Sequence, residues 1–284
     1  MKSLKDYINE SVWDIEDNVE SDNKEFVIDD VKKFIEDNYN NISRYCEFIF
    51  DDKRGKYIVN CKQSVRFESE EEYLTNGLFE WGEVGRYFHC RGCENLKSLE
   101  GAPERVEWQF NCELCPNLET LKGGPKYVGG YFDCSKCPKL TTLEGAPEVV
   151  EGDFYCHECT ELKSLKGAPE IMKNGGFDCS HCPNLESLEG APKKISGIFT
   201  KKSRSYFKCG GCDKLKNLKG APEIVNGYFS CSRCPNLESL EGAPKEVGMQ
   251  FYCTSCPNLL SLDGIGKVKG KIISRFLISH KKTS

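Results

Sequence analysis

Between residues 84 and 263 the chain repeats one pattern of apolar and polar positions. Each unit reads V-x-G-x-F-x-C-x-x-C-P-x-L-x-x-L-x-G-A-P, as in the segment from Val128 to Pro147. The first cysteines of the units stand at 90, 112, 134, 156, 179, 209, 231 and 253. Successive first cysteines are 22 residues apart, except for one spacing of 23 and one of 30. A fixed period of this length predicts a repeat architecture.

The first half of each unit alternates apolar and polar residues with the two-residue period of a half-buried β-strand. The Leu-x-x-Leu half then returns across the core. Gly-Ala-Pro forms the corner, because Gly tolerates positive φ and Pro presets φ. One unit cannot bury its own apolar edge, whereas stacked units can. The pattern therefore predicts a repeat solenoid with a face of parallel β-strands and irregular or short-helical return segments.

The sequence on either side of the repeats predicts a small α+β N-terminal region and two capping segments. Residues 1–56 form an acidic region with two short helices within 3–38 and a β-hairpin that turns at 51–55. Residues 57–83 are expected to form a degenerate capping coil, in which Val59, Cys61 and Ser64 take the places of Phe and the two cysteines. Eight coils follow over 84–263, and residues 264–284 are a C-terminal cap with a basic tail.

The residue after the second leucine of each unit alternates in charge along nearly the whole column. This column comprises Glu100, Lys122, Glu144, Lys166, Glu189, Lys219, Glu241 and Asp263. Opposite charges on adjacent coils favour parallel stacking in register, because a shifted register would lose many such pairs together.

The order F-x-C-x-x-C followed by L-x-x-L is similar to the leucine-rich-repeat pattern L-x-x-L-x-L-x-x-N/C-x-L, over about residues 57–275. There are two departures. The spacing after the Asn/Cys position is one residue longer, and the distance from Val to Phe implies an extended or bulged strand. The "SLEGAP" units and the opening "MKSLKDYINES" resemble short-repeat proteins of tailed phages and gut bacteria. This resemblance implies a fold but no particular function.

Composition and charge narrow the classes of partner and compartment. The 284 residues carry a formal net charge of −5, which argues against nucleic acid as a partner. No segment has the apolar run of a secretory signal or a membrane helix. We therefore expect a cytoplasmic protein, in the host cell or in a virion if a phage encodes it, with no membrane partner.

The 18 cysteines have three interpretations. They are a ladder of small buried side chains, zinc ligands from the Cys-x-x-Cys pairs of adjacent coils, or redox pairs. The inward position of the first cysteine favours the core ladder. Zinc would require coils to act in pairs, and the cysteine pattern shows no such alternation. We therefore expect no cofactor, with zinc kept as the alternative.

The strand positions just before the inward Phe, between Phe and the first Cys, and just after that Cys point outward and vary from coil to coil, which is typical of a recognition surface. The candidate partner-binding residues are Tyr87, His89, Arg91, Tyr131, Asp133, Tyr155, His157, Asp178, Lys201, Lys202, Arg204, Tyr206, Lys208, Tyr228 and Tyr252. Lys201, Lys202 and Arg204 belong to an eight-residue insertion, the kind of loop that often lies on the binding face of a solenoid.

No nucleophile-base constellation or phosphate loop is present in the sequence, so we expect a non-enzymatic scaffold that binds a protein partner. A zinc-binding protein and a structural or glycan-binding component of a virion or cell surface are the alternatives. The sequence does not indicate the oligomeric state.

Overall fold

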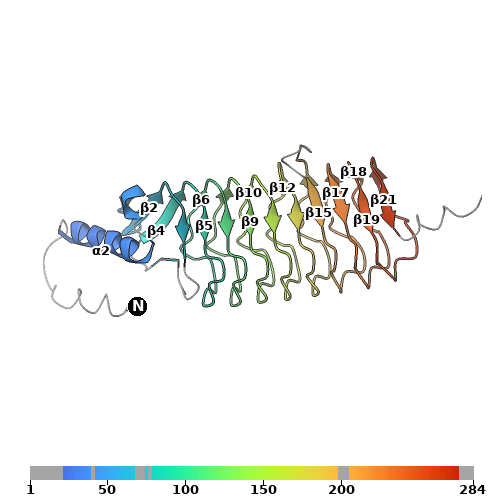
Figure 1. Cartoon of the computed structure of the whole chain (residues 1–284), viewed down its shortest axis with the longest axis horizontal. Coiled ribbons are helices and arrows are strands. Elements are labelled where there is room, and N and C mark those ends of the chain that lie inside the picture. The colour runs from blue at the N-terminus through green and yellow to red at the C-terminus, as the bar shows by residue number, and fades with distance from the viewer. Residues whose placement is uncertain (1–21, 40–41, 68–73, 76–78, 198–204, 275–284) are drawn as a thin grey trace, which may run out of the picture.

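The computed structural model describes residues 22–39, 42–67, 74–75, 79–197 and 205–274. The first of the two expected helices, the insertion at 198–204 and the basic tail lie outside these residues. The described chain forms a long parallel β-solenoid, with a small α+β region at its N-terminal end and β21 at the other (Figure 1). This confirms the predicted fold class.

One wall of the solenoid is a ten-stranded parallel sheet with one strand from each of the eight coils and one from each capping segment. Its strands are β3 (Val65–Arg66), β5 (Phe88–His89), β7 (Phe110–Asn111), β9 (Phe132–Asp133), β11 (Phe154–Tyr155), β13 (Phe177–Asp178), β15 (Tyr206–Lys208), β17 (Tyr228–Ser230), β19 (Phe251–Cys253) and β21 (Ile272–Ser274). The phenylalanines pair across every adjacent coil, as Phe132 does with Phe154. We call the outward side of this sheet the strand face.

A second wall carries the valine positions in two sheets. The first contains β1 (Cys46–Asp51), β2 (Lys56–Cys61), β4 (Phe79–Val84), β6 (Arg105–Val106), β8 (Tyr127–Val128) and β10 (Val149–Val150). The second contains β12 (Ile171–Met172), β14 (Lys194–Ile195), β16 (Ile224–Val225), β18 (Glu246–Val247) and β20 (Lys267–Val268). The return segments with the two leucines are irregular in the described coils.

The expected single strand from Val to Phe is therefore wrong, since each coil bends between two short strands. Val128 belongs to β8 and Phe132 to β9, and both side chains are fully buried. The bend follows from this burial, because the two side chains enter one core from two different walls. The alternating pattern correctly identified the inward residues, but it could not distinguish one wall from two.

Stacked side chains fill the core. The rings of Phe154 and Phe177 stack with centroids 4.9 Å apart, and Phe177 and Phe207 continue the column at 5.6 Å. The two leucines of a coil, such as Leu140 and Leu143, are fully buried. Because each ring or leucine packs on its equivalent in the next coil, apolar burial in this fold depends on stacking.

The N-terminal region closes the first end of this core. Helix α2 (Asp22–Asn38) leads through the short helix η1 (Ile42–Tyr45) to the β1–β2 hairpin, and the hairpin confirms its prediction. The ring of Phe34 lies 6.1 Å from that of Phe79, and Tyr39 lies 5.5 Å from Trp81. The helix thus covers apolar side chains that no preceding coil covers.

The predicted register of the capping coil is wrong. Cys61 pairs with Val84, so it stands in the valine column and not in the cysteine column. Val65 pairs with Phe88 and takes the phenylalanine place. The N–H of Phe67 donates to the carbonyl of His89, as a first cysteine does in the later coils. The shift arises because β2 also forms the hairpin with β1, which commits it to the valine wall.

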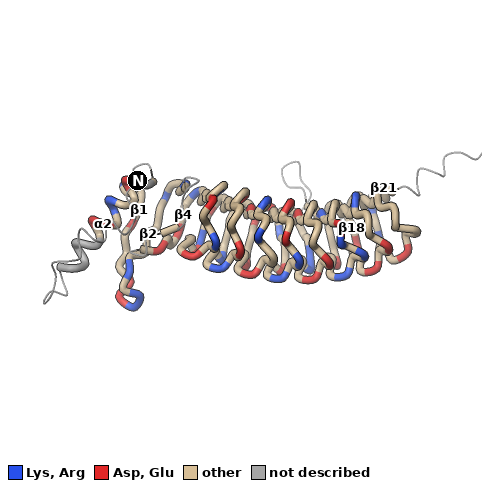
Figure 2. Tube along the Cα trace, turned by 90° about the horizontal axis from the view of Figure 1, so that it is seen from below, with Lys and Arg blue, Asp and Glu red and all other residues tan. Residues whose placement is uncertain are grey.

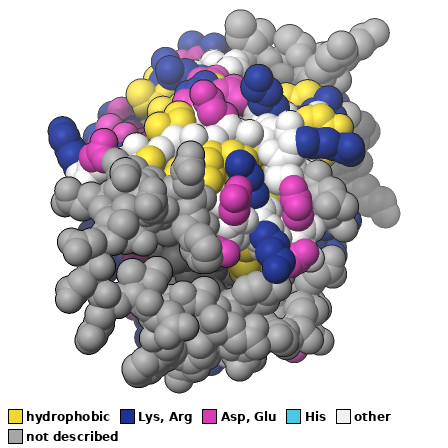
Figure 3. Space-filling model, turned by 90° about the vertical axis from the view of Figure 1, so that its left-hand side faces the viewer, with side chains coloured by type: hydrophobic (Ala, Val, Ile, Leu, Met, Phe, Trp, Pro, Cys, Tyr) yellow, Lys and Arg dark blue, Asp and Glu magenta, His cyan; other side chains and the backbone are white. Residues whose placement is uncertain are grey.

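Opposite charges lie beside each other along the corners of the coils (Figure 2). In the predicted column, Lys166 pairs with Glu144 at 2.8 Å and Lys219 with Glu241 at 3.1 Å. A second column, not predicted, follows the corner proline. Its ion pairs include Lys126–Glu104, Lys193–Glu170 and Lys245–Glu223. At the N-terminal end of the molecule, too, both signs are interspersed on the described surface (Figure 3).

Candidate partner-binding face

The two cysteines of each coil form two buried columns that link neighbouring coils in opposite directions. The thiol of Cys134 donates to the carbonyl of Tyr155 in the next coil, at 3.4 Å. The thiol of Cys159 donates back to the carbonyl of Cys134, at 3.3 Å. Cys156 and Cys182 repeat these contacts one coil further on. The thiols therefore act as small core side chains that also hydrogen-bond the backbone, as the core-ladder interpretation predicts.

The environment of the first cysteine of each coil opposes ionisation of its thiol. Burial raises the pKa of Cys134, Cys156 and Cys179 well above that of a free thiol. Within the described residues, no group of three or more His, Cys, Asp or Glu side chains is arranged to hold a metal ion. Cys46 and Cys61 are a separate pair, directly opposite each other on β1 and β2.

The residue before the second cysteine has a left-handed backbone in each coil. Lys136 and Glu158 both have φ of 57°, and Gly92 and Gly211 occupy the same place in other coils. This conformation turns the chain out of the strand. The N–H of Lys136 donates to the carbonyl of His157 in the next coil, and all the other coils except the last repeat this bond. The turn thus sets where the outward side chains of the strand face lie.

Five tyrosines form a continuous row along the strand face. We call Tyr131, Tyr155, Tyr206, Tyr228 and Tyr252 the tyrosine row. The rings of Tyr131 and Tyr155 meet edge to face with centroids 6.0 Å apart. Tyr206 and Tyr228 stack at 5.4 Å, and Tyr228 meets Tyr252 edge to face at 5.9 Å.

The coil between Tyr155 and Tyr206 has Gly176 in place of a tyrosine, and the ring of Tyr206 fills that place. A Cβ on Gly176 would lie 2.4 Å from the ring of Tyr206, so that ring lies across the glycine. There the side chains of Tyr206 and Tyr155 approach each other. Burial raises the pKa of Tyr155 to about 12 and raises that of Tyr206 further. The row is therefore a fixed surface and not a set of separate side chains.

A second aromatic group lies on the first coils. The Tyr87 ring stacks on His89 with centroids 5.3 Å apart and meets Trp108 edge to face at 5.5 Å. The Arg86 guanidinium lies 5.5 Å from the centre of the Trp108 ring. Trp108 remains 48% exposed. Sequence reasoning missed it because it stands one position before the outward residue that precedes Phe, at a place where half of the coils have Gly.

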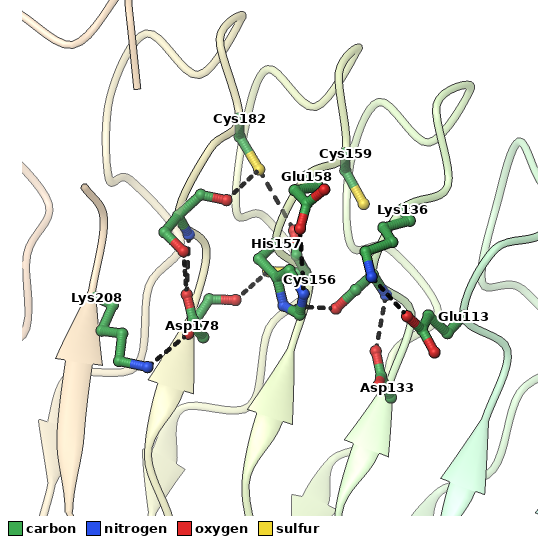
Figure 4. A network of polar contacts seen from close by, with 12 residues as sticks. Glu113, Asp133, Lys136, Cys156, His157, Glu158, Cys159, Asp178, Cys182 and Lys208 are labelled. Carbon is green, nitrogen blue, oxygen red and sulfur yellow. Dashed lines mark hydrogen bonds and ion pairs between the residues drawn. The ribbon is translucent and has the colours of Figure 1, made fainter. Parts of the chain in front are cut away.

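Charged side chains beside the tyrosine row are paired with one another (Figure 4). Glu113 accepts hydrogen bonds from Arg91 at 2.8 Å and from Lys136 at 3.0 Å. Burial alone would raise the pKa of Glu113, but these two partners hold it below its usual value. His157 hydrogen-bonds Ser135 at 2.9 Å.

The two candidate aspartates bond to the backbone of their own coils. Oδ1 of Asp133 accepts the N–H of Ser135 at 2.9 Å, and Oδ1 of Asp178 accepts the N–H of Ser180 at 3.1 Å. Asp178 also accepts from Lys208 at 2.9 Å (Figure 4). Burial raises the pKa of Asp133. These carboxylates therefore hold the turn after the strand.

The candidate residues differ in exposure. Asp178 and Tyr206 are buried, at 7% each, which corrects their assignment as freely outward-facing. Arg91 is exposed. The half-buried candidates are Tyr87, His89, Tyr131, Asp133, Tyr155, His157, Lys208, Tyr228 and Tyr252. Lys201, Lys202 and Arg204 lie outside the described residues.

The face is hollowed at the coils that carry β13, β15, β17 and β19. The hollow has a volume of about 400 Å³ and is lined by Asp178, Ser180, His181, Lys208, Gly210, Ser230, Ser232, Arg233 and Thr254. Most of these side chains are small and polar. The hollow is bordered by the strand that carries Tyr228, so the strand face combines an aromatic row with a polar depression.

Comparison with known proteins identifies no relative. No protein-family model matches the chain, and no curated protein or solved structure is significantly similar to it. Among the described helices, none is long and apolar enough to cross a lipid bilayer.

Proposed function

We propose that this protein is a non-enzymatic solenoid that binds a protein partner through its strand face. The observation that carries the proposal is the continuity of the tyrosine row over the coils from Tyr131 to Tyr252. Tyr combines a large apolar ring with a hydroxyl and has few rotatable bonds. It is therefore enriched in the parts of interfaces that contribute most to affinity.

Preorganisation supports this proposal. The rings of the tyrosine row already contact one another, so a partner that packs on them orders few additional side chains. Ordering costs about 0.5–1.5 kcal/mol for each immobilised side chain. We place the protein in the cytoplasm, where its free core thiols stay reduced.

The test is a triple variant in which Tyr131, Tyr155 and Tyr228 are changed to Ala. Immobilised wild-type protein should capture a partner that mass spectrometry identifies, and the purified partner is then titrated against the variant. We expect binding to fall by more than tenfold, the equivalent of about 1.4 kcal/mol, because three anchor rings are lost.

The matched control is Tyr127→Ala. Tyr127 lies on β8 of the valine wall, where its ring is 3.8 Å from the guanidinium of Arg105. It is another half-buried tyrosine, but it lies away from the strand face. Equal losses in the two variants would refute the proposal, as would full binding by a folded triple variant. Capture of a glycan and no protein would favour the glycan-binding alternative.

A further inference from the structure

Two of the coils that form the hollow differ from most earlier coils in whether a side chain accepts the backbone N–H after the strand. In three of the five preceding coils, a side-chain oxygen of the strand accepts the N–H two residues further on. Asn111 accepts from Glu113 at 3.0 Å, and Asp133 and Asp178 make the same bond in their own coils. An Asn or Asp oxygen thus fills one defined place on the strand face.

In the next two coils that place is held by Lys208 and Ser230. The backbone N–H groups that would be capped belong to Gly210 and Ser232. Within the described chain neither N–H has a hydrogen-bond partner. Both residues line the hollow, and their strands β15 and β17 are adjacent. Two neighbouring backbone donors therefore lack the oxygen that Asp supplies elsewhere.

The side chains around these donors favour an anion. Arg233 lines the hollow, is exposed, and forms no ion pair within the described residues. Lys208 adds a second cation, which Asp178 offsets. The hydroxyl oxygen of Ser232 accepts from both the N–H and the hydroxyl of Thr254, at 3.1 Å each. With both acceptor sites used, the Ser232 hydroxyl has only its proton left to offer a ligand.

We propose that this hollow binds a carboxylate of the partner, from an Asp or Glu side chain that inserts between Gly210 and Ser232. Adjacent strands are about 4.8 Å apart, so each carboxylate oxygen can accept one backbone N–H. The partner's oxygens would take the places that Asp133 and Asp178 fill in their own coils. The inference rests on the proposed binding role of the strand face and specifies an acidic residue in the partner.

The test is an NMR titration of the 15N-labelled full chain with sodium acetate, with sodium chloride keeping the ionic strength constant. We expect the amide protons of Gly210 and Ser232 to shift downfield and to saturate. The amides of Ser135 and Ser180 are already capped by aspartates and should not respond. Equal responses at all four amides, or none at Gly210 and Ser232, would overturn the proposal.

Three variants at Ser230 distinguish the effect of capping the Ser232 N–H from the effect of adding a charge. Ser230→Asp and Ser230→Asn supply the missing cap, and we expect both to weaken the response of Ser232 to acetate at least tenfold. Ser230→Ala leaves the N–H open and should keep the response. An unchanged response in the Asp and Asn variants, with the fold intact, contradicts the proposal.

The tyrosine row is intact in all three variants, so a partner found by capture distinguishes this inference from the proposed function. If capture survives Ser230→Asp, the carboxylate site is refuted and binding through the tyrosine row stands. Loss of capture with Ser230→Asp but not with Ser230→Ala supports both.

Discussion

Gly145 at a coil corner allows the sharpest test of the stacking. Its φ is 93°, and an added Cβ would lie 2.4 Å from the carbonyl carbon of Leu121 and from the nitrogen of Lys122. Both atoms are backbone of the preceding coil, so they cannot rotate away as a side chain would. Gly145→Ala should therefore force the two coils apart or strain the corner.

The expected loss has two parts. A left-handed backbone costs a non-glycine residue about 1–2 kcal/mol, and overpacking costs about 1–3 kcal/mol. We therefore expect Gly145→Ala to lower the free energy of unfolding by about 2–5 kcal/mol. Urea unfolding followed by far-ultraviolet circular dichroism measures this quantity, provided that the slope with denaturant is unchanged.

Ser255→Gly is the matched control, because it reverses the direction of the change. Ser255 is exposed and has φ of 57° at the turn before Cys256, which is the second cysteine of the last coil. Glycine relieves about 1–2 kcal/mol of backbone strain and loses about 0.5–1 kcal/mol through entropy, so the variant should be as stable as wild type or slightly more stable. A loss below about 1 kcal/mol for Gly145→Ala would refute the close stacking.

Three further predictions concern titration, thiols and metal. The raised pKa of Tyr155, about 12, stabilises the fold below the usual tyrosine pKa near 10, and that contribution is lost as pH rises. Wild type should therefore lose unfolding free energy more steeply than Tyr155→Phe between about pH 10 and 12; equal slopes would contradict this. Iodoacetamide should modify Cys46 before any other cysteine, because the other 17 are buried; peptide mass spectrometry would show a different first site if this is wrong. A chelator should leave the melting temperature unchanged, whereas elemental analysis that finds about four zinc ions per chain would favour the zinc alternative.

The sequence predicted the inward residues well, because each column repeats in every coil and its burial has one explanation. Phe, both cysteines and both leucines are fully buried in coils such as that of Phe132, Cys134 and Leu140. The division of each coil between two walls was not predictable, since period-two alternation continues across the bend. The capping register was missed because β2 pairs with both β1 and β4, and single-coil alignment ignores pairing.

The sequence predicted where the candidate face lies, but not which side chains contact one another on it. Tyr131, Tyr155 and Tyr228 lie on it as the alternation indicates, but the alternation also placed Asp178 there as if it were free. Its carboxylate instead bonds Ser180 and Lys208. The pairing with Lys208, like that of His157 with Ser135, joins neighbouring coils 22 to 30 residues apart. A pattern within one coil therefore cannot reveal it.

The alternating corner charges constrain how such a chain can change length. Each coil contacts only its neighbours, so a block of coils can be duplicated or lost without altering the rest of the stack. Removing one coil would set two like charges side by side, for example Glu144 next to Glu189, whereas removing two restores a Glu beside a Lys. The identical segments 182–192 and 234–244 are two coils apart and carry the same charge at the corner. The corner charges therefore favour changes of length by pairs of coils.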